Sequence, residues 1–360
     1  MSELRHNILT REWVIVAPER AKRPDDFKKA HKPISSGPSF LANCPFCPGN
    51  EHMTKPSTLV VPNGDGWKLR VVGNKYPSLS FEGERQRILQ GIRRVVTGVG
   101  VHEVIIDTPE HNRPLALMDN YQVEVIISAY LDRFRYASAD PRVEQVTIFK
   151  NHGEAAGTSL EHPHSQVIGT PVITAQLRDR LSNALRHFDE FGECIFCRVM
   201  EMELKEQARV VIESRHFVLF VQFAALTPFS MMIMPRRHMA VFSEMTDDEA
   251  QDLAQILRNT LAKLHYGLDD PDFNFTIRTA PLEYQGVKYF HWYLSIIPRL
   301  TRTAGFELGS GMFVNVRLPE EDAAFLRRTL VNELLSGKAE STNAENGRDE
   351  SENAEGLGRI

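Results

Sequence analysis

Three side chains that could take part in one reaction stand at alternate positions of a short polar segment, His162-Pro163-His164-Ser165-Gln166. If the segment is extended, residues 162, 164 and 166 project from the same face. A neutral imidazole can ligate a metal or act as a nucleophile, and a carboxamide can donate hydrogen bonds to a phosphoryl oxygen. The spacing therefore predicts a reactive face. The alternative is two surface histidines in a polar loop.

The four cysteines occur as two Cys-x-x-Cys pairs, one in each half of the chain. Zinc prefers four cysteine or histidine ligands in a tetrahedron, and a Cys-x-x-Cys turn supplies two of them. The first pair is Cys44 and Cys47, and His111 and His162 can complete the set. The alternatives are a redox dithiol and two buried thiols without a ligand. The prolines and the glycine around the pair favour a knuckle turn, and hence a structural zinc site.

The second pair, Cys194 and Cys197, has less certain partners. His238 is the third candidate ligand, and His291 is the candidate for the fourth position. Aligning the two halves on the prolines near the ends of their last strands places His291 two residues beyond the position of His162. Either His291 has taken over the fourth position or the second metal site is incomplete.

The composition is that of an ordinary globular enzyme: 360 residues, 42% hydrophobic and 25% charged, with a net charge of -5. The lysines and arginines are scattered, so no basic stripe indicates a nucleic-acid partner. No apolar run approaches the length of a membrane span, and the N-terminus lacks the hydrophobic stretch of a signal peptide. We therefore expect a cytoplasmic enzyme whose paired cysteines do metal or redox work rather than form structural disulfides.

One order of elements surrounds the first set of ligands. A strand-like run at 102–107 leads to His111, a helix is expected over 119–135, and a strand at 146–149 precedes the segment that begins at His162. The helix starts with a capping-box pattern, and its apolar residues recur at helical spacing. This half therefore reads as strands crossed by one main helix.

The same order occurs again in the second half. A strand-like run at 231–234 leads to His238, a second capping box starts a helix at Thr246, and a strand at 273–277 precedes His291. One such parallel could arise by chance, but a whole ordered series is not expected to. We therefore interpret the chain as a structural duplication.

The duplication predicts an α+β protein with two tandem halves, each a mainly antiparallel sheet with one crossing helix. The halves span residues 1–172 and 193–330, and a connecting helix is expected at 173–192. The segment 337–360 has no aromatic residue and is rich in Glu, Asn, Ser and Gly. Such a composition cannot bury enough apolar surface to fold, so we expect a disordered tail.

The chain resembles the galactose-1-phosphate uridylyltransferase family in three places: Cys44-Pro-Phe-Cys47, His111, and Gly157-Thr-Ser-Leu-Glu-His162-Pro-His164-Ser-Gln166. The resemblance runs from about residue 5 to about residue 330. That family is a doubled member of the histidine triad superfamily, so both halves should be histidine-triad-like. The resemblance implies that His162 is a zinc ligand, His164 the nucleophile and Gln166 the stabiliser of a covalent intermediate.

The resemblance also implies which molecules the site binds. The expected partners are a nucleotide sugar, a hexose 1-phosphate and a second copy of the chain in a homodimer. Fixed donors must meet the charge on the transferring phosphoryl group, and arginines can pair with phosphates in bidentate fashion. We expect such substrate contacts from Arg20, Arg23, Asn74, Asn151, Gly157 and Ser159, in addition to Gln166.

Some segments depart from the family's enteric-type members. Residues 74–77 read Asn-Lys-Tyr-Pro where those members have Asn-Asp, and residues 151–153 read Asn-His-Gly instead of Asn-Lys-Gly. Residues 290–292 and 305–312 look more like the plant ADP-glucose phosphorylase branch and its bacterial relatives. These departures do not change the expected reaction type. They concern which nucleotide base and which sugar the enzyme uses.

Three functions follow as hypotheses. The first is transfer of UMP from UDP-glucose to galactose 1-phosphate through a nucleotidyl-histidine, with UDP-sugars as the better donors. The second is an ADP-glucose phosphorylase-like adenylyl transfer that uses the same histidine and inorganic phosphate. The third is a zinc-stabilised nucleotide-binding protein without catalysis, which the intact set of His162, His164 and Gln166 argues against.

Overall fold

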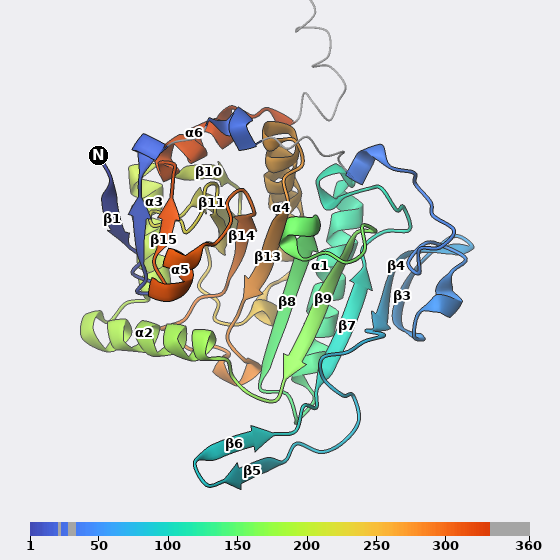
Figure 1. Ribbon diagram of the computed structural model, residues 1–360. Coiled ribbons are helices and arrows are strands. Elements are labelled where there is room, and N and C mark those ends of the chain that lie inside the picture. The colour runs from blue at the N-terminus through green and yellow to red at the C-terminus, as the bar shows by residue number, and fades with distance from the viewer. Residues whose placement is uncertain (21–22, 28–33, 332–360) are drawn as a thin grey trace, which may run out of the picture.

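The computed structural model describes residues 1–20, 23–27 and 34–331, so the tail predicted at 337–360 lies outside the described residues. The centre of the fold is one sheet of ten strands, in the order β10-β11-β12-β14-β13-β8-β9-β7-β4-β3 (Figure 1). All neighbours in it are antiparallel. The strands are β3 (Ser57–Asn63), β4 (Gly66–Gly73), β7 (Val101–Ile106), β8 (Gln145–His152), β9 (His164–Thr170), β10 (Val210–Glu213), β11 (Phe217–Val221), β12 (Met231–Pro235), β13 (Phe273–Arg278) and β14 (Tyr293–Pro298).

The two halves meet edge to edge inside this sheet. Strand β8 of the first half pairs with β13 of the second half, and Asn151 stands opposite Asn274. The predicted α+β fold with two mainly antiparallel halves is confirmed. The sequence did not indicate that the two sheets are continuous. The pattern of apolar residues shows which face of a strand is buried, but it does not show which strand edges pair. The division at residues 172 and 193 stays a prediction.

Two long helices pack against the sheet and against each other: α1 (Asn120–Ser138) and α4 (Asp247–Leu268). The side chain of Asp119 accepts a hydrogen bond from the backbone N–H of Gln122 and so caps α1. Thr246 and Glu249 form the reciprocal capping box of α4. Both helices therefore begin where the sequence pattern placed them, because the caps satisfy backbone N–H groups that a helix start leaves unpaired.

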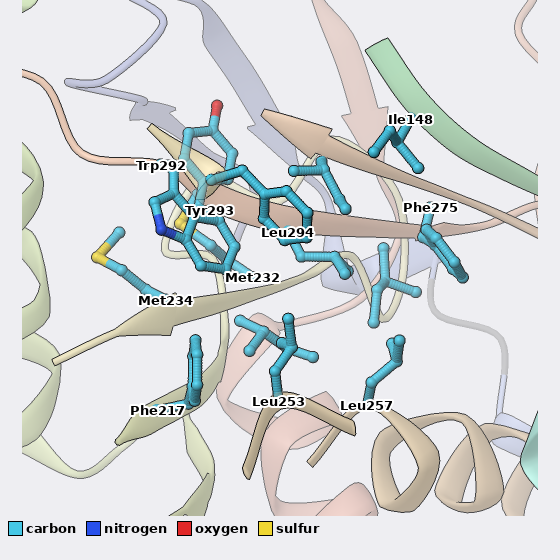
Figure 2. Close-up of a cluster of buried hydrophobic side chains, with 14 of the residues drawn as sticks. Ile148, Phe217, Met232, Met234, Leu253, Leu257, Phe275, Trp292, Tyr293 and Leu294 are labelled. Atoms are coloured by element: carbon cyan, nitrogen blue, oxygen red, sulfur yellow. The ribbon is translucent and has the colours of Figure 1, made fainter. Parts of the chain in front are cut away.

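The core between α4 and the sheet is built from large apolar side chains. Leu253 and Leu257 of α4 face Phe217 and Leu294, and Trp292 lies beside them (Figure 2). All five are fully buried, and each such side chain contributes about 1.5–3 kcal/mol relative to exposure. Because side chains alternate along a strand, the residues between these apolar ones point to the opposite face of the sheet.

The remaining elements surround the sheet. A small sheet joins β1 (Glu3–His6), β2 (Trp13–Val16) and β15 (Phe313–Asn315), and a hairpin consists of β5 (Arg87–Gln90) and β6 (Arg93–Val96) (Figure 1). The other helices are α2 (Ala175–Phe191), α3 (Ile195–Glu206), α5 (Gly305–Ser310) and α6 (Pro319–Arg328). None of the helices in the described part of the chain has both the length and the apolar character that a membrane span requires.

The capping box of α4 makes a testable contribution to stability. Glu249 accepts hydrogen bonds from Thr246 and from Arg237, and the bond from Arg237 is the main cause that lowers the pKa of Glu249 to about 2. Glu249→Ala should lower the free energy of unfolding by about 1–3 kcal/mol. Chemical denaturation measures this, with the exposed Asp248→Ala as the control.

The pH dependence of this difference has a fixed sign. A carboxylate whose pKa is lowered on folding stabilises the protein above its ordinary pKa of 4.5, and this contribution disappears as the pH falls towards 2. The difference in the free energy of unfolding between the wild type and Glu249→Ala should therefore decrease from pH 5 to pH 2.5. A gap that stays constant over this range would contradict the assignment.

Candidate active site

The structure brings together four side chains predicted to bind metal in the first half: Cys44, Cys47, His111 and His162. All four are buried, and their ligand atoms lie within 4.8 Å of one another. Cys44 Sγ is 3.7 Å from His162 Nδ1, and Cys47 Sγ is 3.6 Å from Nδ1 of both histidines. Tetrahedral zinc, with bonds of about 2.3 Å to sulfur and 2.0–2.1 Å to nitrogen, requires sulfur–nitrogen edges of about 3.6 Å. The donors and their spacing therefore fit a zinc ion.

His162 is prepared for ligation by its second nitrogen. Nε2 lies 2.7 Å from the carbonyl oxygen of Thr108, which can only accept, so Nε2 carries the proton. Nδ1 is left with its lone pair facing the cysteines. Burial lowers the pKa of His162 to about 4, so the ring is neutral at neutral pH, as a metal ligand must be.

The second half contains a matching set of ligands: Cys194, Cys197, His238 and His291. Cys197 Sγ lies 3.3 Å from His238 Nδ1 and 3.4 Å from His291 Nδ1. His238 Nε2 donates to the carbonyl oxygen of Val287 over 2.9 Å, which fixes the same tautomer as in His162. This set can also hold a metal ion.

The alignment of the halves on their prolines was wrong by two residues. His291 stands at the ligand position that corresponds to His162, not two residues beyond it. The reason is that Pro298 is the last residue of β14, whereas Pro171 lies just beyond the end of β9. The proline therefore falls closer to the metal ligand in the second half, and a proline is a poor marker of register.

His164 is the first residue of β9 and is 8% exposed. Its Nδ1 lies 2.8 Å from the carbonyl oxygen of His162, so Nδ1 carries the ring proton and Nε2 holds the lone pair. Burial lowers the pKa of His164, which keeps the ring neutral. The edge of the Phe46 ring packs against it, with 5.4 Å between centroids. A neutral imidazole with one fixed tautomer has the form that a nucleophile needs.

Gln166 lies two residues beyond His164, and His102 orients its amide. The backbone N–H of Ser78 donates to His102 Nδ1 over 3.0 Å, so His102 Nε2 carries the proton. Nε2 then donates to Gln166 Oε1 over 2.9 Å. This contact leaves the Gln166 NH₂ group available to a phosphoryl oxygen. The backbone N–H of Asn74 donates to the carbonyl oxygen of His102 over 2.9 Å, which places Asn74 next to the same residue.

A buried ion pair supports the backbone of His164. Lys150 Nζ donates to Asp107 Oδ2 over 2.6 Å and to the carbonyl oxygen of His164 over 2.9 Å. Asp107 also accepts from the Ser165 hydroxyl, which is 2.6 Å from Tyr130 OH. Lys150 is 2% exposed and Asp107 is 0% exposed. The network ties His164 to strand β8 and to the end of strand β7.

The loop with the other predicted substrate residues is held by the second half. Asn274 Nδ2 donates to Asn151 Oδ1 over 2.8 Å, and Asp272 accepts a hydrogen bond from the loop backbone over 2.7 Å. Gly157 has φ of +87°, a conformation that favours glycine, and Ser159 is exposed. These contacts place a polar loop next to β8, and the backbone N–H groups of residues 155–158 are hydrogen-bonded within the loop or to Asp272. The substrate-binding roles of Asn151, Gly157 and Ser159 stay predictions.

The two arginines predicted to bind nucleotide lie at the protein surface. Arg20 ends a short 3-10 helix and is exposed, and Arg23 is exposed as well. Exposure alone does not indicate a ligand. Their role also stays a prediction.

Sequence patterns do not reveal the residues that hold His164 and Gln166 in place. His102 stands in no recognisable motif of the sequence. Asp107 and Lys150 each stand in or next to a strand-like apolar run. A charged residue in such a run signals a buried partner, because an unpaired charge would be too costly there. That signal could have found the pair, although it could not have matched Asp107 with Lys150.

Removal of Lys150 tests the buried network. Lys150→Met should leave Asp107 buried and unpaired and lower the free energy of unfolding by about 3–5 kcal/mol. Lys150→Met combined with Asp107→Asn should recover part of this loss, because no charge remains. Denaturant titration measures both, with the exposed Lys205→Met as the control. A loss no larger than that of the control would show that the ion pair does not carry this region.

The chain is similar to known proteins over most of its length. Two family models match it: galactose-1-phosphate uridyl transferase, N-terminal domain, over residues 1–174, and galactose-1-phosphate uridyl transferase, C-terminal domain, over residues 180–309. The ADP-glucose phosphorylase of Arabidopsis thaliana is 38% identical over 90% of this chain and 92% of that protein. The galactose-1-phosphate uridylyltransferase of Thermotoga maritima is 31% identical over 92% of this chain and 99% of that protein.

A solved structure agrees with these matches. The crystal structure of the Arabidopsis thaliana ADP-glucose phosphorylase with bound ADP-glucose has a TM-score of 0.78 and 34% identity. The similarity covers 92% of this chain and 99% of that one. The predicted resemblance is therefore confirmed, and the geometry around His164 has the residues that such chemistry requires. The chain belongs to the galactose-1-phosphate uridylyltransferase family and is a nucleotidyltransferase.

Proposed function

We propose that this enzyme moves a nucleoside monophosphate from a nucleotide sugar to a phosphate-bearing acceptor in two displacements, with His164 as the nucleophile. The observation that carries the proposal is the fixed tautomer of His164. Its Nδ1–H is bound by the His162 carbonyl oxygen, which leaves the Nε2 lone pair for attack. Two anions would otherwise have to meet at one phosphorus, and a neutral intermediate nucleophile avoids this.

Each displacement forms one bond to phosphorus and breaks another. The His164 Nε2 lone pair attacks the phosphorus next to the nucleoside, a P–N bond forms, and the P–O bond to the sugar phosphate breaks. Hexose 1-phosphate leaves with that electron pair, and it is a weak enough base to need no strong acid. An oxygen of the acceptor then attacks the same phosphorus, and the P–N bond breaks. The ring is neutral again, with Nδ1–H still bound to the His162 carbonyl.

Gln166 stabilises the transferring group without reacting. Its NH₂ group can donate to a phosphoryl oxygen because His102 holds its other end. A carboxamide suits this task better than a cation, since the nucleotidyl group must also leave the enzyme. Asn151, Gly157 and Ser159 supply further contacts to the transferring group in this proposal, and Arg20, Arg23 and Asn74 contact the nucleotide sugar.

The metal is proposed to be zinc with a structural role. Cys44, Cys47, His111 and His162 would hold it, and the second set of ligands would hold another. Bound zinc supplies a rigid cross-link between the Cys-x-x-Cys turn and the strand that begins at His164. The carbonyl oxygen of His162 then stays in place for the nucleophile's Nδ1–H.

The donor and the acceptor are the finer part of the proposal. UDP-glucose with galactose 1-phosphate is the first candidate, supported by the family models and by the similar enzyme of Thermotoga maritima. ADP-glucose with inorganic phosphate is the second candidate, and the 38% identity to the Arabidopsis thaliana enzyme favours it. A homodimer is proposed from the family resemblance alone, and a cytoplasmic location is proposed from the composition of the sequence.

The metal proposal predicts the zinc content of the purified protein. We expect about one zinc per ligand set, measured by plasma emission spectrometry. Cys47→Ser should lose the first zinc and weaken attack by His164, because the loop loosens. Cys194→Ser is the matched control, which should lose the other zinc and keep the reaction at His164. Less than about half an equivalent of zinc per chain, with no loss in Cys47→Ser, would contradict the metal assignment.

The nucleophile is tested by incubating the protein separately with UDP-glucose and ADP-glucose that carry ³²P next to the nucleoside. The wild type should gain base-stable, acid-labile label, and His164→Gly should gain none while it keeps its fold and zinc. Gln166→Arg should be labelled but turn over slowly, because a fixed cation holds the adduct. The exposed His52→Gly is the control.

Initial-rate lines should be parallel, as two displacements require. The donor with the larger kcat/KM identifies the base. We expect kcat/KM for UDP-glucose with galactose 1-phosphate to be modestly larger than that for ADP-glucose with phosphate. A larger value for ADP-glucose with phosphate would make the second candidate the function. Label that persists in His164→Gly would show that another residue is the nucleophile.

The role of His102 as a positioning residue can be separated from a structural role. His102→Phe keeps the ring but loses the hydrogen bond to Gln166, so kcat should fall about 10- to 100-fold while KM changes little. His102→Gln, which keeps an N–H donor, should restore part of kcat. In a Gln166→Ala background, His102→Phe should have almost no further effect. An equal loss in both backgrounds would show that His102 supports the fold only.

A further inference from the structure

The second half has a position that corresponds to the nucleophile but no nucleophilic histidine. Because His291 stands at the ligand position of His162, Tyr293 stands where the first half has His164. Tyr293 is also the first residue of its strand, as His164 is. A phenol is a much poorer nucleophile than a neutral imidazole, so Tyr293 does not take over the role of His164.

A cavity of about 190 Å³ opens at this position. The strand register makes Arg278 the counterpart of Asn151 and Ser295 the counterpart of Gln166. Arg278, Tyr293 and Ser295 line the cavity from the sheet, and Arg180 of α2 lines it from outside. The arrangement therefore repeats the phosphate-handling face of the first half, with an arginine in place of an asparagine.

The two guanidinium groups in this cavity are not balanced by acids. In the described part of the chain, neither Arg180 nor Arg278 has a carboxylate within 4.0 Å. Arg180 Nε is buried and makes no hydrogen bond there, and Arg278 donates only to Gln176 Oε1, at 3.3 Å. Burial and the positive charge of Arg180 lower the pKa of Arg278. Glu12 also lines the cavity, and its charge partly opposes the lowering of the pKa of Arg278, but one exposed carboxylate does not balance two cations.

Two hydroxyl groups complete the polar wall. The side chains of Tyr293 and Ser295 make no hydrogen bond to any residue that the structure describes. The ring of Tyr293 lies against that of Phe196, with 5.7 Å between centroids, and its hydroxyl oxygen points away from the apolar cluster (Figure 2). Unpaired arginines and free hydroxyls around one cavity are the donors that a tetrahedral anion accepts.

We propose that this cavity is a second anion site, which binds one phosphate group in the half of the enzyme that has no nucleophile. Its volume lies below the range of about 300–1,000 Å³ that is typical for larger ligands, so a whole nucleotide sugar does not fit. Inorganic phosphate and the phosphate of a small sugar phosphate share the chemistry that would be recognised. The site binds and does not react.

Binding is measured by isothermal titration calorimetry of the full chain with inorganic phosphate and, separately, with glucose 1-phosphate. Arg180→Gln combined with Arg278→Gln should weaken one class of sites by about tenfold or more. The matched control combines Arg178→Gln with Arg186→Gln, which removes two exposed arginines of α2 and changes the net charge equally. Any binding at the His164 site is common to all three proteins, so the difference isolates the cavity.

Two further measurements keep the test independent of misfolding. Tyr293→Phe removes a single hydroxyl and should weaken the same class about 3- to 10-fold. Without phosphate, the double variant should unfold at a temperature no lower than the wild type, because two unbalanced cations are gone. With phosphate, only the wild type and the control should be stabilised through the cavity. Whichever of inorganic phosphate and glucose 1-phosphate binds more tightly identifies the molecule that supplies the phosphate group.

Equal binding isotherms in the wild type, the double variant and the control would overturn the proposal. So would a phosphate-dependent rise in unfolding temperature that is unchanged in the double variant. Neither result would bear on the nucleophile, because no turnover is measured.

Discussion

The hydrogen bond between His164 Nδ1 and the carbonyl oxygen of His162 decides which nitrogen can react. It holds only if both backbone positions are fixed, and the structure fixes them by different means. The ring of His162 belongs to a metal-binding set, and the carbonyl of His164 accepts from Lys150. Burying Lys150 with Asp107 costs solvation of two charges, which their mutual attraction offsets only with good geometry. The site therefore has a buried ion pair on one side and a set of residues that could hold a metal on the other.

Much of the site could be predicted because its residues lie close together in sequence or have few alternatives. His162, His164 and Gln166 follow the period of a strand, and a Cys-x-x-Cys pair needs two more ligands of known types. His102 could not be found in this way, since its contact with Gln166 depends on the register between β7 and β9, which places Gln166 diagonally across from it. The partnership of Asp107 and Lys150 depends on that register and on the pairing of β8 with β9. For the fold, helix caps marked where α1 and α4 begin, whereas the pairing of β8 with β13 had no signal in either strand.

The second half supports the first in a specific way. Asn274 and Asp272 bind the loop that carries Asn151 and Gly157, so the polar loop of one half is held by side chains of the other. The cost of ordering a loop with glycine and exposed polar residues is large, and contacts from a preformed strand reduce it. The second half therefore helps to fix the geometry of the loop next to His164 in the first half.

The continuous sheet also bears on how the two halves can differ. In an assembly of two identical chains, one codon would specify both copies of every position, and replacing the histidine in one copy would remove it from the other as well. Here the pairing of β8 with β13 joins the copies inside a single polypeptide. Equivalent places are encoded separately, so Tyr293 and His164 can diverge while the metal ligands on both sides are kept. The two halves therefore keep the same types of residue at the metal-binding positions and differ at the position of His164.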